Sequence, residues 1–592
     1  MHVDIVPNRR SPPAILLRET WREGKRVRKR TVANLTKEVT LAQALIIRRV
    51  LNGETLVAPS DAFEQLSSKS HGHVRAVLFA MRRLGVERLI ASRSSAERDL
   101  VLTLIAQRII KPESKLASVR AWRTTTLTQE LGLPSGVSED DVYRAMDWLV
   151  ARQGRIEAKL AKRHLREGSL VRFDLSSSYV EGEHCELAAF GHNRDKKRGK
   201  KQINWGLLTD EEGRPISLSL FPGSTGDPTT LDQQVTRLRE RFNIDSFTLV
   251  GDRGMITGKH IERFHFANAA RDERDDGSGG DGVDGDGGGS TAGGRIDWIT
   301  ALQSATLKKL VDQGVIQSSL FDESNLFEIT HDDYPGERLI ACRNPVLGRK
   351  RAHKRRDMLR ATLEDLSKTK ARVDAGRLKG ADKIGVAVGG KLGKRKMGKH
   401  IDVTITDSTF EYQTDTASLE REAAMDGIYV IRTSLPQQVM DGAATVRAYK
   451  DLSRAERAFR TIKGIDLSVR PIHHRLLERV TAHFFICTLA YYVRWHMERA
   501  WASITFADEH SADPDRDPVA PAQRSASARR KAQTRKLDNG DDTHSFATLL
   551  ADLATIQQTT CKEAISGATF PMTTTPSPAQ QHALDLLDSI TV

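Results

Sequence analysis

The residues best suited to chemistry are four polar side chains in residues 446–463, a stretch that contains neither Gly nor Pro. Tyr449, Glu456, Arg460 and Lys463 are separated by seven, four and three residues, so on a helix turning about 100° per residue they share one face. Apolar residues at helical spacing adjoin them, namely Leu452, Ala455, Phe459 and Ile462. The stretch predicts a helix presenting a carboxylate, a phenol and two cations. A plain surface helix with a Glu456–Arg460 ion pair is the alternative.

Two further carboxylates lie on predicted strands. Residues 169–180 alternate like a strand with Asp174 in the middle, and a β-rich run from residue 246 ends in Asp252. Mg²⁺ takes carboxylate oxygens and keeps positions open for phosphate and water. Two ions roughly 3.5–4 Å apart activate an attacking oxygen and stabilise a leaving one. With Glu456, these residues are the ingredients of a two-metal phosphoryl-transfer site, although sequence spacing alone does not establish that they converge.

The composition favours a polyanionic partner. The chain of 592 residues has a formal charge of +14 and a pI near 9.5, but charge alone does not separate nucleic acid from a ribosome or membrane surface. The four cysteines lie far apart, which argues against a disulfide framework and a structural zinc site. No apolar run reaches the roughly 18 residues that span a bilayer. With no signal-peptide pattern at the N-terminus, we expect a cytoplasmic protein without a membrane partner.

The first two predicted domains could bind DNA. In residues 1–70, a β-hairpin over residues 14–33 precedes a helix near 40–52, and the second strand is basic. That strand could lie on phosphates or be a solvated edge strand. Residues 71–168 are helical by period. Within them, a helix ending at Gly132 and a second helix capped by Ser138 and Asp141 suggest a helix-turn-helix, although ordinary helical bundles contain the same arrangement.

In residues 169–302 the predicted elements follow one another in the order strand, strand, strand, helix, strand, helix, strand. The strands fall near residues 169–180, 202–209, 215–221, 246–252 and 297–302, and one helix near 228–242. Residues 271–294 are almost wholly Gly, Asp and Ser, and we expect a flexible acidic loop there. The hexad Gly279–Asp284 matches a calcium-binding β-helix repeat, but that fold needs several copies. Trp298 is expected to be a core aromatic.

The remainder divides into three segments. Residues 303–426 are strongly basic, with a helix heading from Arg349 to about residue 376 and a Gly-rich loop over 391–400. Its cations favour phosphate contact, and the expected DNA-binding residues are Lys350, Arg351, Lys354 and Arg355. Residues 427–501 hold a strand, the polar helix and a buried helix over 479–493, where His483 and Cys487 read as core residues. Residues 502–592 are expected to be largely disordered, with an amphipathic helix near 545–558.

Taken together, these motifs resemble the bacterial insertion-sequence DDE transposases that carry a Tyr-Arg-Glu-Lys pattern. In that pattern two residues separate Tyr from Arg, three separate Arg from Glu, and six separate Glu from Lys. Tyr449, Glu456 and Lys463 match in register, whereas Leu452 occupies the Arg position, so Arg460 and Arg454 are the candidates for the missing charge. The resemblance covers roughly residues 14–500. Its other matching segments are Trp21–Thr31, Lys111–Ala117, Phe173–Asp174, Phe221–Asp227, Val250–Gly254 and Arg470–Ile472.

The resemblance implies an α/β fold, an RNase H-like mixed sheet flanked by helices, with a β-rich insertion at 303–426 and a mostly helical N-terminal DNA-binding region. It implies that Asp174, Asp252 and Glu456 hold two Mg²⁺ or Mn²⁺ ions. The enzyme would bind terminal inverted repeats, and water would free a 3′-hydroxyl that then attacks target DNA. The expected contacts to double-stranded DNA are Tyr449, Arg253, Arg460 and Lys463. Relatives act as homodimers on paired ends, so we expect the same assembly.

Two other functions fit the same residues. Leu452 in the Arg position is compatible with a catalytically inactive or repurposed transposase-derived protein that only binds DNA. A plain metal-dependent nuclease is the third hypothesis, and strand-transfer products would distinguish it from a transposase.

Overall fold

A computed structural model describes residues 1–592 except 10, 55–60, 277–293, 318–320, 323–324, 510–516, 521–522, 565 and 592. The chain forms two compact units, one of Met1–Lys69 with Gln557–Thr575 and one of Ser70–Ile556 with Pro576–Val592. Helix α10 (Gly258–Asp276) occupies the first residues of the predicted acidic loop, so that loop begins later than expected. The calcium-like hexad Gly279–Asp284 lies outside the described residues. Within the described residues, no helix is both long and apolar enough to cross a membrane.

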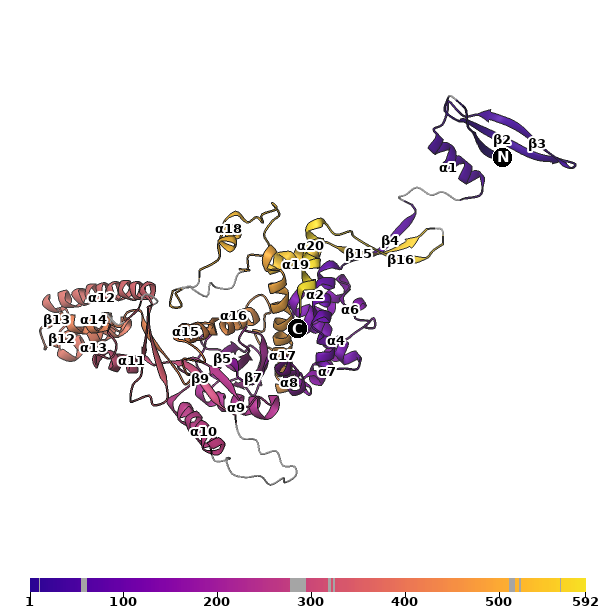
Figure 1. Cartoon of the computed structure of the whole chain (residues 1–592). Helices are drawn as coiled ribbons and strands as arrows, with labels where there is room; N and C mark the ends of the chain where they lie inside the picture. Colours follow the sequence, from indigo (N-terminus) through magenta and orange to yellow (C-terminus); the bar gives the residue numbers. More distant parts are fainter. Residues whose placement is uncertain are drawn as a thin grey trace, which may run out of the picture. The chain divides into compact units, whose positions relative to one another are not determined.

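The larger unit is built on an eight-stranded sheet with the strand order β10-β11-β14-β9-β8-β5-β6-β7. Strands β5, β6 and β7 form an antiparallel meander, β8 and β9 run parallel to β5, and the other three strands extend the sheet antiparallel (Figure 1). The predicted mixed sheet is confirmed. Its strands are β5 (Ser169–Tyr179), β6 (Gln202–Thr209), β7 (Pro215–Pro222), β8 (Phe247–Val250), β9 (Ile296–Ala301), β10 (Leu326–Ile329), β11 (Arg338–Arg343) and β14 (Ile428–Thr433).

Side-chain alternation assigns the two faces of this sheet. Val171, Phe173 and Leu175 of β5 pack in one core with α9 (Leu231–Thr236) and α10. Successive strand residues point to opposite faces, so Asp174 faces the other layer, where α16 (Leu452–Lys463) packs against β5. Trp298 is fully buried in the first core, as predicted for a core aromatic.

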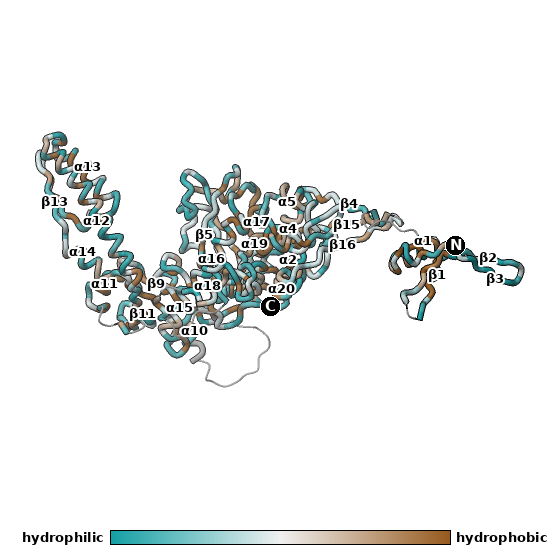
Figure 2. Tube along the Cα trace, turned by 90° about the horizontal axis from the view of Figure 1, so that it is seen from above, coloured by the Kyte–Doolittle hydropathy of each residue, from teal (hydrophilic) through white to brown (hydrophobic). Residues whose placement is uncertain are grey.

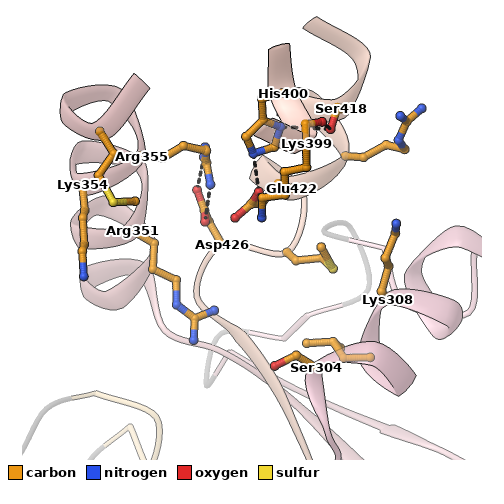
Figure 3. A pocket seen from close by; sticks show the side chains of 14 residues that line it. Ser304, Lys308, Arg351, Lys354, Arg355, Lys399, His400, Ser418, Glu422 and Asp426 are labelled. Carbon is orange, nitrogen blue, oxygen red and sulfur yellow. Dashed lines mark hydrogen bonds and ion pairs between the residues drawn. The ribbon is translucent and has the colours of Figure 1, made fainter. Parts of the chain in front are cut away.

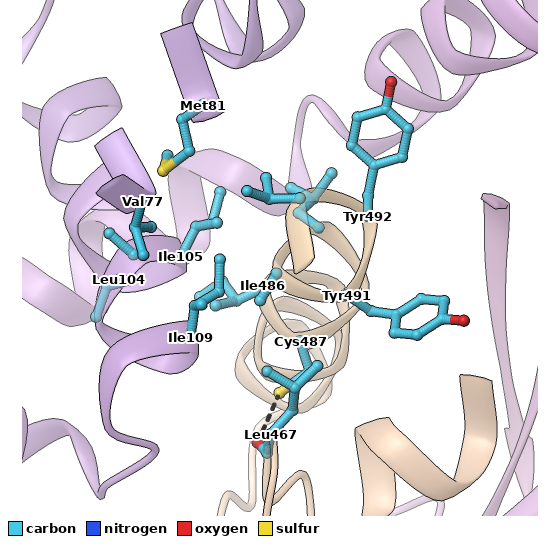
Figure 4. Packing of buried hydrophobic residues seen from close by; sticks show 14 of the residues in the cluster. Val77, Met81, Leu104, Ile105, Ile109, Leu467, Ile486, Cys487, Tyr491 and Tyr492 are labelled. Carbon is cyan, nitrogen blue, oxygen red and sulfur yellow. Dashed lines mark hydrogen bonds between the residues drawn. The ribbon is translucent and has the colours of Figure 1, made fainter. Parts of the chain in front are cut away.

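The predicted helical region is confirmed, and it packs on the helix α17 (Leu477–Ala500). Helices α2 (Gly72–Arg83), α4 (Ala96–Ile110) and α7 (Glu139–Val150) all contact α17, which also contacts β7 (Figure 1). Val77, Ile105 and Ile109 belong to one hydrophobic cluster with Ile486 of α17 (Figure 4). His483 is buried on α17 and bonds the Val469 carbonyl at 2.9 Å, in accord with its predicted core role.

The expected helix-turn-helix is not a pair of comparable helices. Its first member, α6 (Leu127–Glu130), has four residues. The capping box of Ser138 and Asp141 is present, and α7 buries Val142, Met146 and Leu149 as predicted. However, the first turn of α7 carries three carboxylates, which would repel phosphates where a recognition helix meets DNA. We therefore assign α7 to the core.

The predicted continuous helix over 446–463 is wrong, because the chain breaks at Asp451 into α15 (Gly442–Lys450) and α16. The two helices pack into different hydrophobic cores. Val446 and Ala448 pack beside β9 and β14, whereas Phe459 and Ile462 join the core of α17 and β6. A straight helix could not turn its apolar face toward both cores, and the break at Asp451 allows each half to follow its own.

The insertion is helical rather than β-rich, which corrects the prediction for residues 303–426. After α11 (Ser304–Asp312), strands β10 and β11 join the main sheet, and two long helices follow, α12 (Pro345–Asp374) and α13 (Ala381–Arg395). A small hairpin of β12 (Ile401–Ile405) and β13 (Phe410–Thr414) precedes α14 (Thr416–Ala423). Only residues 391–395 of the expected Gly-rich loop belong to α13, whose Ile384 and Val388 pack at helical spacing against Leu366 and Val373 of α12.

The prediction of a largely disordered C-terminal segment is also wrong for its described residues. It contains α18 (Ala526–Thr534), α19 (Phe546–Leu553), α20 (Pro578–Leu586), β15 (Gln557–Glu563) and β16 (Thr569–Thr573). Helix α19 corresponds to the predicted amphipathic helix. Leu549 and Leu553 are buried in the large core, and the Trp501 indole donates to the Ala583 carbonyl at 2.8 Å. These short apolar segments are stable because an existing core receives them.

The smaller unit confirms the predicted hairpin and helix. Strands β1 (His2–Val6), β2 (Ala14–Glu23) and β3 (Arg26–Asn34) form one sheet with α1 (Leu41–Leu51) beside it, and β4 (Phe63–Ser70) pairs in a second sheet with β15 and β16. Figure 2 shows β2 and β3 as mostly hydrophilic. Cross-strand ion pairs offset part of the basic charge, with Arg28–Glu23 at 2.9 Å and Arg30–Glu19 at 2.8 Å.

Trp205 of β6 links the sheet to both α16 and α17. Its ring is fully buried, lies edge-on to Phe459 at 4.7 Å between centroids and packs on Phe484 at 5.2 Å, and its indole donates to Ser178 Oγ at 3.1 Å.

We predict that Trp205→Ala lowers the free energy of unfolding by about 3–5 kcal/mol, measured by chemical denaturation. Phe266→Ala is the control because Phe266 is 78% exposed in the same unit. Equal losses in both variants would contradict the assignment.

Candidate active site

Asp174 lies in the middle of the long central strand, partly buried and opposite Leu207 of β6. One carboxylate oxygen accepts the Leu175 amide N–H at 2.7 Å. Burial, with smaller contributions from the negative charges of Glu456 and Asp252, raises the pKa of Asp174 to about 6. Two residues far away in sequence are therefore close enough in space to disfavour ionisation of Asp174.

Asp252 follows β8, which runs parallel to β5 on the neighbouring position of the sheet. The side chain is exposed, accepts the Arg253 amide N–H at 2.7 Å and accepts the Tyr449 hydroxyl at 3.5 Å. Burial and the adjacent Asp252 charge raise the pKa of Tyr449. The end of α15 is thus tied to the second predicted carboxylate.

Glu456 is exposed on α16, beside the buried stripe of Ala455, Phe459 and Ile462. Packing of Phe459 on Trp205 holds this helix on the sheet. Glu456 therefore projects on the side where α16 faces β5, and its position depends on a rigid aromatic contact one turn further along the helix.

The three carboxylates line one cleft of about 1140 Å³. Other side chains that line it are Arg194, Asp195, Lys196, Tyr449, Arg460, Lys463 and Arg470. Among the described residues, no three His, Cys, Asp or Glu side chains are grouped tightly enough to hold a metal ion by themselves. The donors are nonetheless hard oxygens, and a divalent cation would offset both the burial of the Asp174 carboxylate and its smaller repulsion by Glu456 and Asp252. The residues therefore fit such an ion.

Lys463 lies in the cleft, but its ammonium group has partners within the protein. It pairs with Asp195 at 2.6 Å and donates to Ser176 Oγ at 3.0 Å, and Arg470 pairs with the same carboxylate. Burial lowers the pKa of Lys463. In this structure the predicted DNA-contact residue joins the catalytic helix to the loop that carries Asp195.

The position expected to hold Arg is filled by an apolar contact. Leu452 packs partly buried against the core beside β9 and β14. Arg454 pairs with Asp451 at 3.0 Å, whereas the exposed Arg460 lines the cleft. Of the two candidates for the missing charge, Arg460 is the one placed beside the carboxylates.

A second, basic pocket of about 600 Å³ lies between α11, α12 and α14. Arg351 and Lys354 line it as exposed residues, as do Lys308, Lys399 and Arg421 (Figure 3). The expected DNA contact Arg355 lines it too, but its guanidinium pairs with Asp426. Lys350 is exposed and is not among the lining residues.

Sequence reasoning missed several of these residues. Lys399 belongs to the basic run of residues 391–400, whereas Lys308 and Arg421 lie outside the basic runs and become its neighbours only through the fold. Arg194 and Lys196 belong to a run of six cations in residues 194–201, a signal that was available and not used.

Comparison with known families decides the assignment. The model of the Transposase DDE domain matches residues 169–493, which is more than half of the chain and includes all three carboxylates. The chain belongs to the DDE transposase family. The model of the IS1634 family transposase N-terminal domain matches residues 3–61 of the smaller unit. The protein is therefore an insertion-sequence transposase, an enzyme of DNA transposition in a class that generally uses divalent metal ions.

Other comparisons add little. No curated protein matches the transposase. Among solved structures, a cryo-EM structure of the piggyBac transposase synaptic complex with hairpin DNA is similar at a TM-score of 0.32 and 8% identity, covering 71% of this chain and 72% of that chain. The family matches carry the assignment.

The raised pKa of Asp174 generates a test of metal binding that does not depend on catalysis. We predict that Mn²⁺ raises the melting temperature of the transposase, because a ligand at 100 times its Kd stabilises a folded protein by about 2.7 kcal/mol. Asp174→Asn should lose most of this shift. Asp232→Asn should retain it, because Asp232 pairs with Arg263 at 2.7 Å outside the cleft. Equal shifts in the two variants would argue against metal at Asp174.

Proposed function

We propose that the transposase binds the terminal inverted repeats of its own element and cuts them with two Mg²⁺ or Mn²⁺ ions held by Asp174, Asp252 and Glu456. The observation that supports this most is the meeting of three carboxylates from β5, the end of β8 and α16 in one cleft. Water attacks first and breaks a phosphodiester bond to free a 3′-hydroxyl. That hydroxyl then attacks a phosphorus of target DNA at the same site, which forms a new phosphodiester bond and breaks the target's own bond, releasing a target 3′-hydroxyl.

Four residues of the cleft have a defined role in this scheme. The bound ions would activate the attacking oxygen and stabilise the leaving oxygen. Asp174 sits on the rigid central strand and supplies a ligand whose position is set by the sheet. Tyr449 donates to Asp252 and orients that carboxylate, and the exposed Arg460 offers a cation to the phosphates of the bound strand.

A basic path leads away from the cleft. The guanidinium of Arg253, next to Asp252, lies 3.4 Å from Ser304 Oγ, and Ser304 lines the basic pocket. Six Lys and Arg side chains line that pocket against two carboxylates, Glu422 and Asp426, so its excess charge is positive. We propose that the DNA duplex runs from the cleft past Arg253 to Arg351 and Lys354, which contact its phosphates.

We further propose that two copies of the transposase assemble on two element ends. The support is the resemblance to relatives that act as homodimers on paired ends. The mass of the protein–DNA complex in solution tests it, and a complex holding a single copy with two ends would contradict it.

Replacement of one carboxylate should separate cleavage from binding. We predict that Asp252→Ala lowers the rate of end cleavage in Mg²⁺ by at least about 10³-fold, since metal-ion stabilisation contributes several kcal/mol to such a transition state. Binding to end DNA should change little, as measured by fluorescence anisotropy. Asp232→Asn, outside the cleft, should cleave normally. An Asp252→Ala protein that still cut its ends would show that the carboxylate assignment is wrong.

The basic pocket makes a separate prediction about salt. The variant Arg351→Gln/Lys354→Gln should bind DNA more weakly, with the slope of log K against log salt reduced by about 1 for each lost phosphate contact. Lys368→Gln/Arg372→Gln is the matched control on exposed residues of the same helix, outside the pocket. A slope equal to that of the control would place the duplex elsewhere.

A further inference from the structure

The segment between β5 and β6 carries the densest positive charge near the catalytic cleft. Residues 194–201 contain six cations and one carboxylate, and most of their side chains are exposed. The cations are Arg194, Lys196, Lys197, Arg198, Lys200 and Lys201. We call residues 194–201 the basic loop. The family pattern around Glu456 and the metal scheme assign it no role.

The carboxylate in this loop is its anchor. The Asp195 side chain is 1% exposed, pairs with Lys463 at 2.6 Å and with Arg470, and accepts the Tyr179 amide N–H at 3.1 Å. Lys463 ends the catalytic helix, so Asp195 ties the basic loop to the helix that carries Glu456. Two cations hold one buried carboxylate, and this arrangement leaves the remaining charge of the loop directed outward.

The base of the loop has further supports. The Arg194 amide N–H donates to Ser177 Oγ at 3.0 Å on β5, and its guanidinium pairs with Asp227 at 2.5 Å. A Cβ at Gly191 would lie 2.0 Å from the Gly223 carbonyl oxygen, so two loops pass each other at backbone contact. The base is therefore held by β5 and by the segment after β7.

The loop also borders the reacting centre. Arg194, Asp195 and Lys196 line the same cleft as Asp174 and Glu456, and Lys197, Arg198 and Lys200 are exposed beyond them. A phosphodiester backbone carries a regular row of negative charges that such a cluster would contact regardless of base sequence.

We propose that Lys196, Lys197 and Arg198 bind the phosphodiester backbone of the DNA strand entering the catalytic cleft. Asp195 is the positioning residue, which holds the loop at the cleft through Lys463 and Arg470. This inference rests on the proposed function and names a contact that the function requires. The strand belongs either to the element end or to the target DNA, and the two share this chemistry.

A charge-matched comparison tests the contact. The variant Lys196→Gln/Lys197→Gln/Arg198→Gln should bind DNA at least tenfold more weakly without added metal, with a salt slope reduced by about 2 to 3. The control Lys368→Gln/Arg372→Gln/Arg377→Gln removes the same charge from exposed residues of α12 and the turn after it. Equal affinities of the two variants would overturn the proposal.

Two reaction assays identify the strand. A raised KM for end cleavage with little change in kcat assigns the loop to the element end. A raised KM for target DNA, with a pre-cut end supplied, assigns it to the target. An unchanged KM in both assays overturns the proposal. Because the binding measurement needs no catalysis, a failure of the carboxylate assignment in the Asp252→Ala test would leave the binding result standing, so the two failures are distinguishable.

The direction in which DNA affinity changes in one variant tests the positioning role of Asp195. Asp195→Asn removes a negative charge and releases Lys463 and Arg470, so general electrostatics predicts tighter DNA binding. Our proposal predicts binding at least tenfold weaker, because the loop loses its anchor, and partial recovery in Asp195→Glu. Melting temperatures establish that each variant is folded. If Asp195→Asn does not fold, Asp195→Glu carries the test. Its longer side chain retains the negative charge but displaces the carboxylate, so this variant should bind DNA more weakly than the unchanged protein. Tighter or unchanged binding in the folded variant would overturn the positioning role.

Discussion

Burial of the Asp174 carboxylate, with the charges of Glu456 and Asp252 close by, is the constraint on which the rest of this structure depends. Raising the pKa of Asp174 from 3.8 to about 6 costs the folded state about 3 kcal/mol once the group is ionised. That cost is absent below about pH 4 and fully present above about pH 6, because the raised pKa belongs to the folded protein. Something must hold the acids together against it. The sheet fixes Asp174 and Asp252, and the Trp205–Phe459 contact fixes α16.

The sequence predicted these three acids because each has a local signal. Asp174 sits in an alternating strand, Asp252 ends an apolar run, and Glu456 shares a helical stripe with Tyr449 and Lys463. The succession of strands and helices along residues 169–302 was likewise predictable from period and turns, whereas their order within the sheet was not. The break at Asp451 was not, because local periodicity continues smoothly through it and only the presence of two separate cores makes it necessary. The β-rich insertion was expected from the family resemblance, whereas the residues themselves carry a helical signal, the spacing of Ile384 and Val388.

Contacts between charges were the least predictable part of the site. A residue pattern specifies that Lys463 is a cation on the stripe, but its partner depends on the backbone 268 positions earlier, where Asp195 becomes buried. The same holds for Arg355, whose pairing with Asp426 removes it from the group of exposed cations on α12. Sequence locates charge, whereas the fold decides which charges are neutralised inside the protein and which are left for a polyanion.

This division of charge explains why a basic protein can hold an acidic centre. Buried or half-buried cations such as Lys463 and Arg470 are used to orient Asp195, and exposed ones such as Lys196 and Arg460 line the cleft with the acids. Negative phosphates approaching three carboxylates would be repelled without such a surround. Under the proposed function, cations at the edge of the cleft would attract the DNA without neutralising the carboxylates, which would keep the acids available as metal ligands. The positive rim and the acidic centre are therefore complementary requirements of one site, and the loop between β5 and β6 is where the two meet.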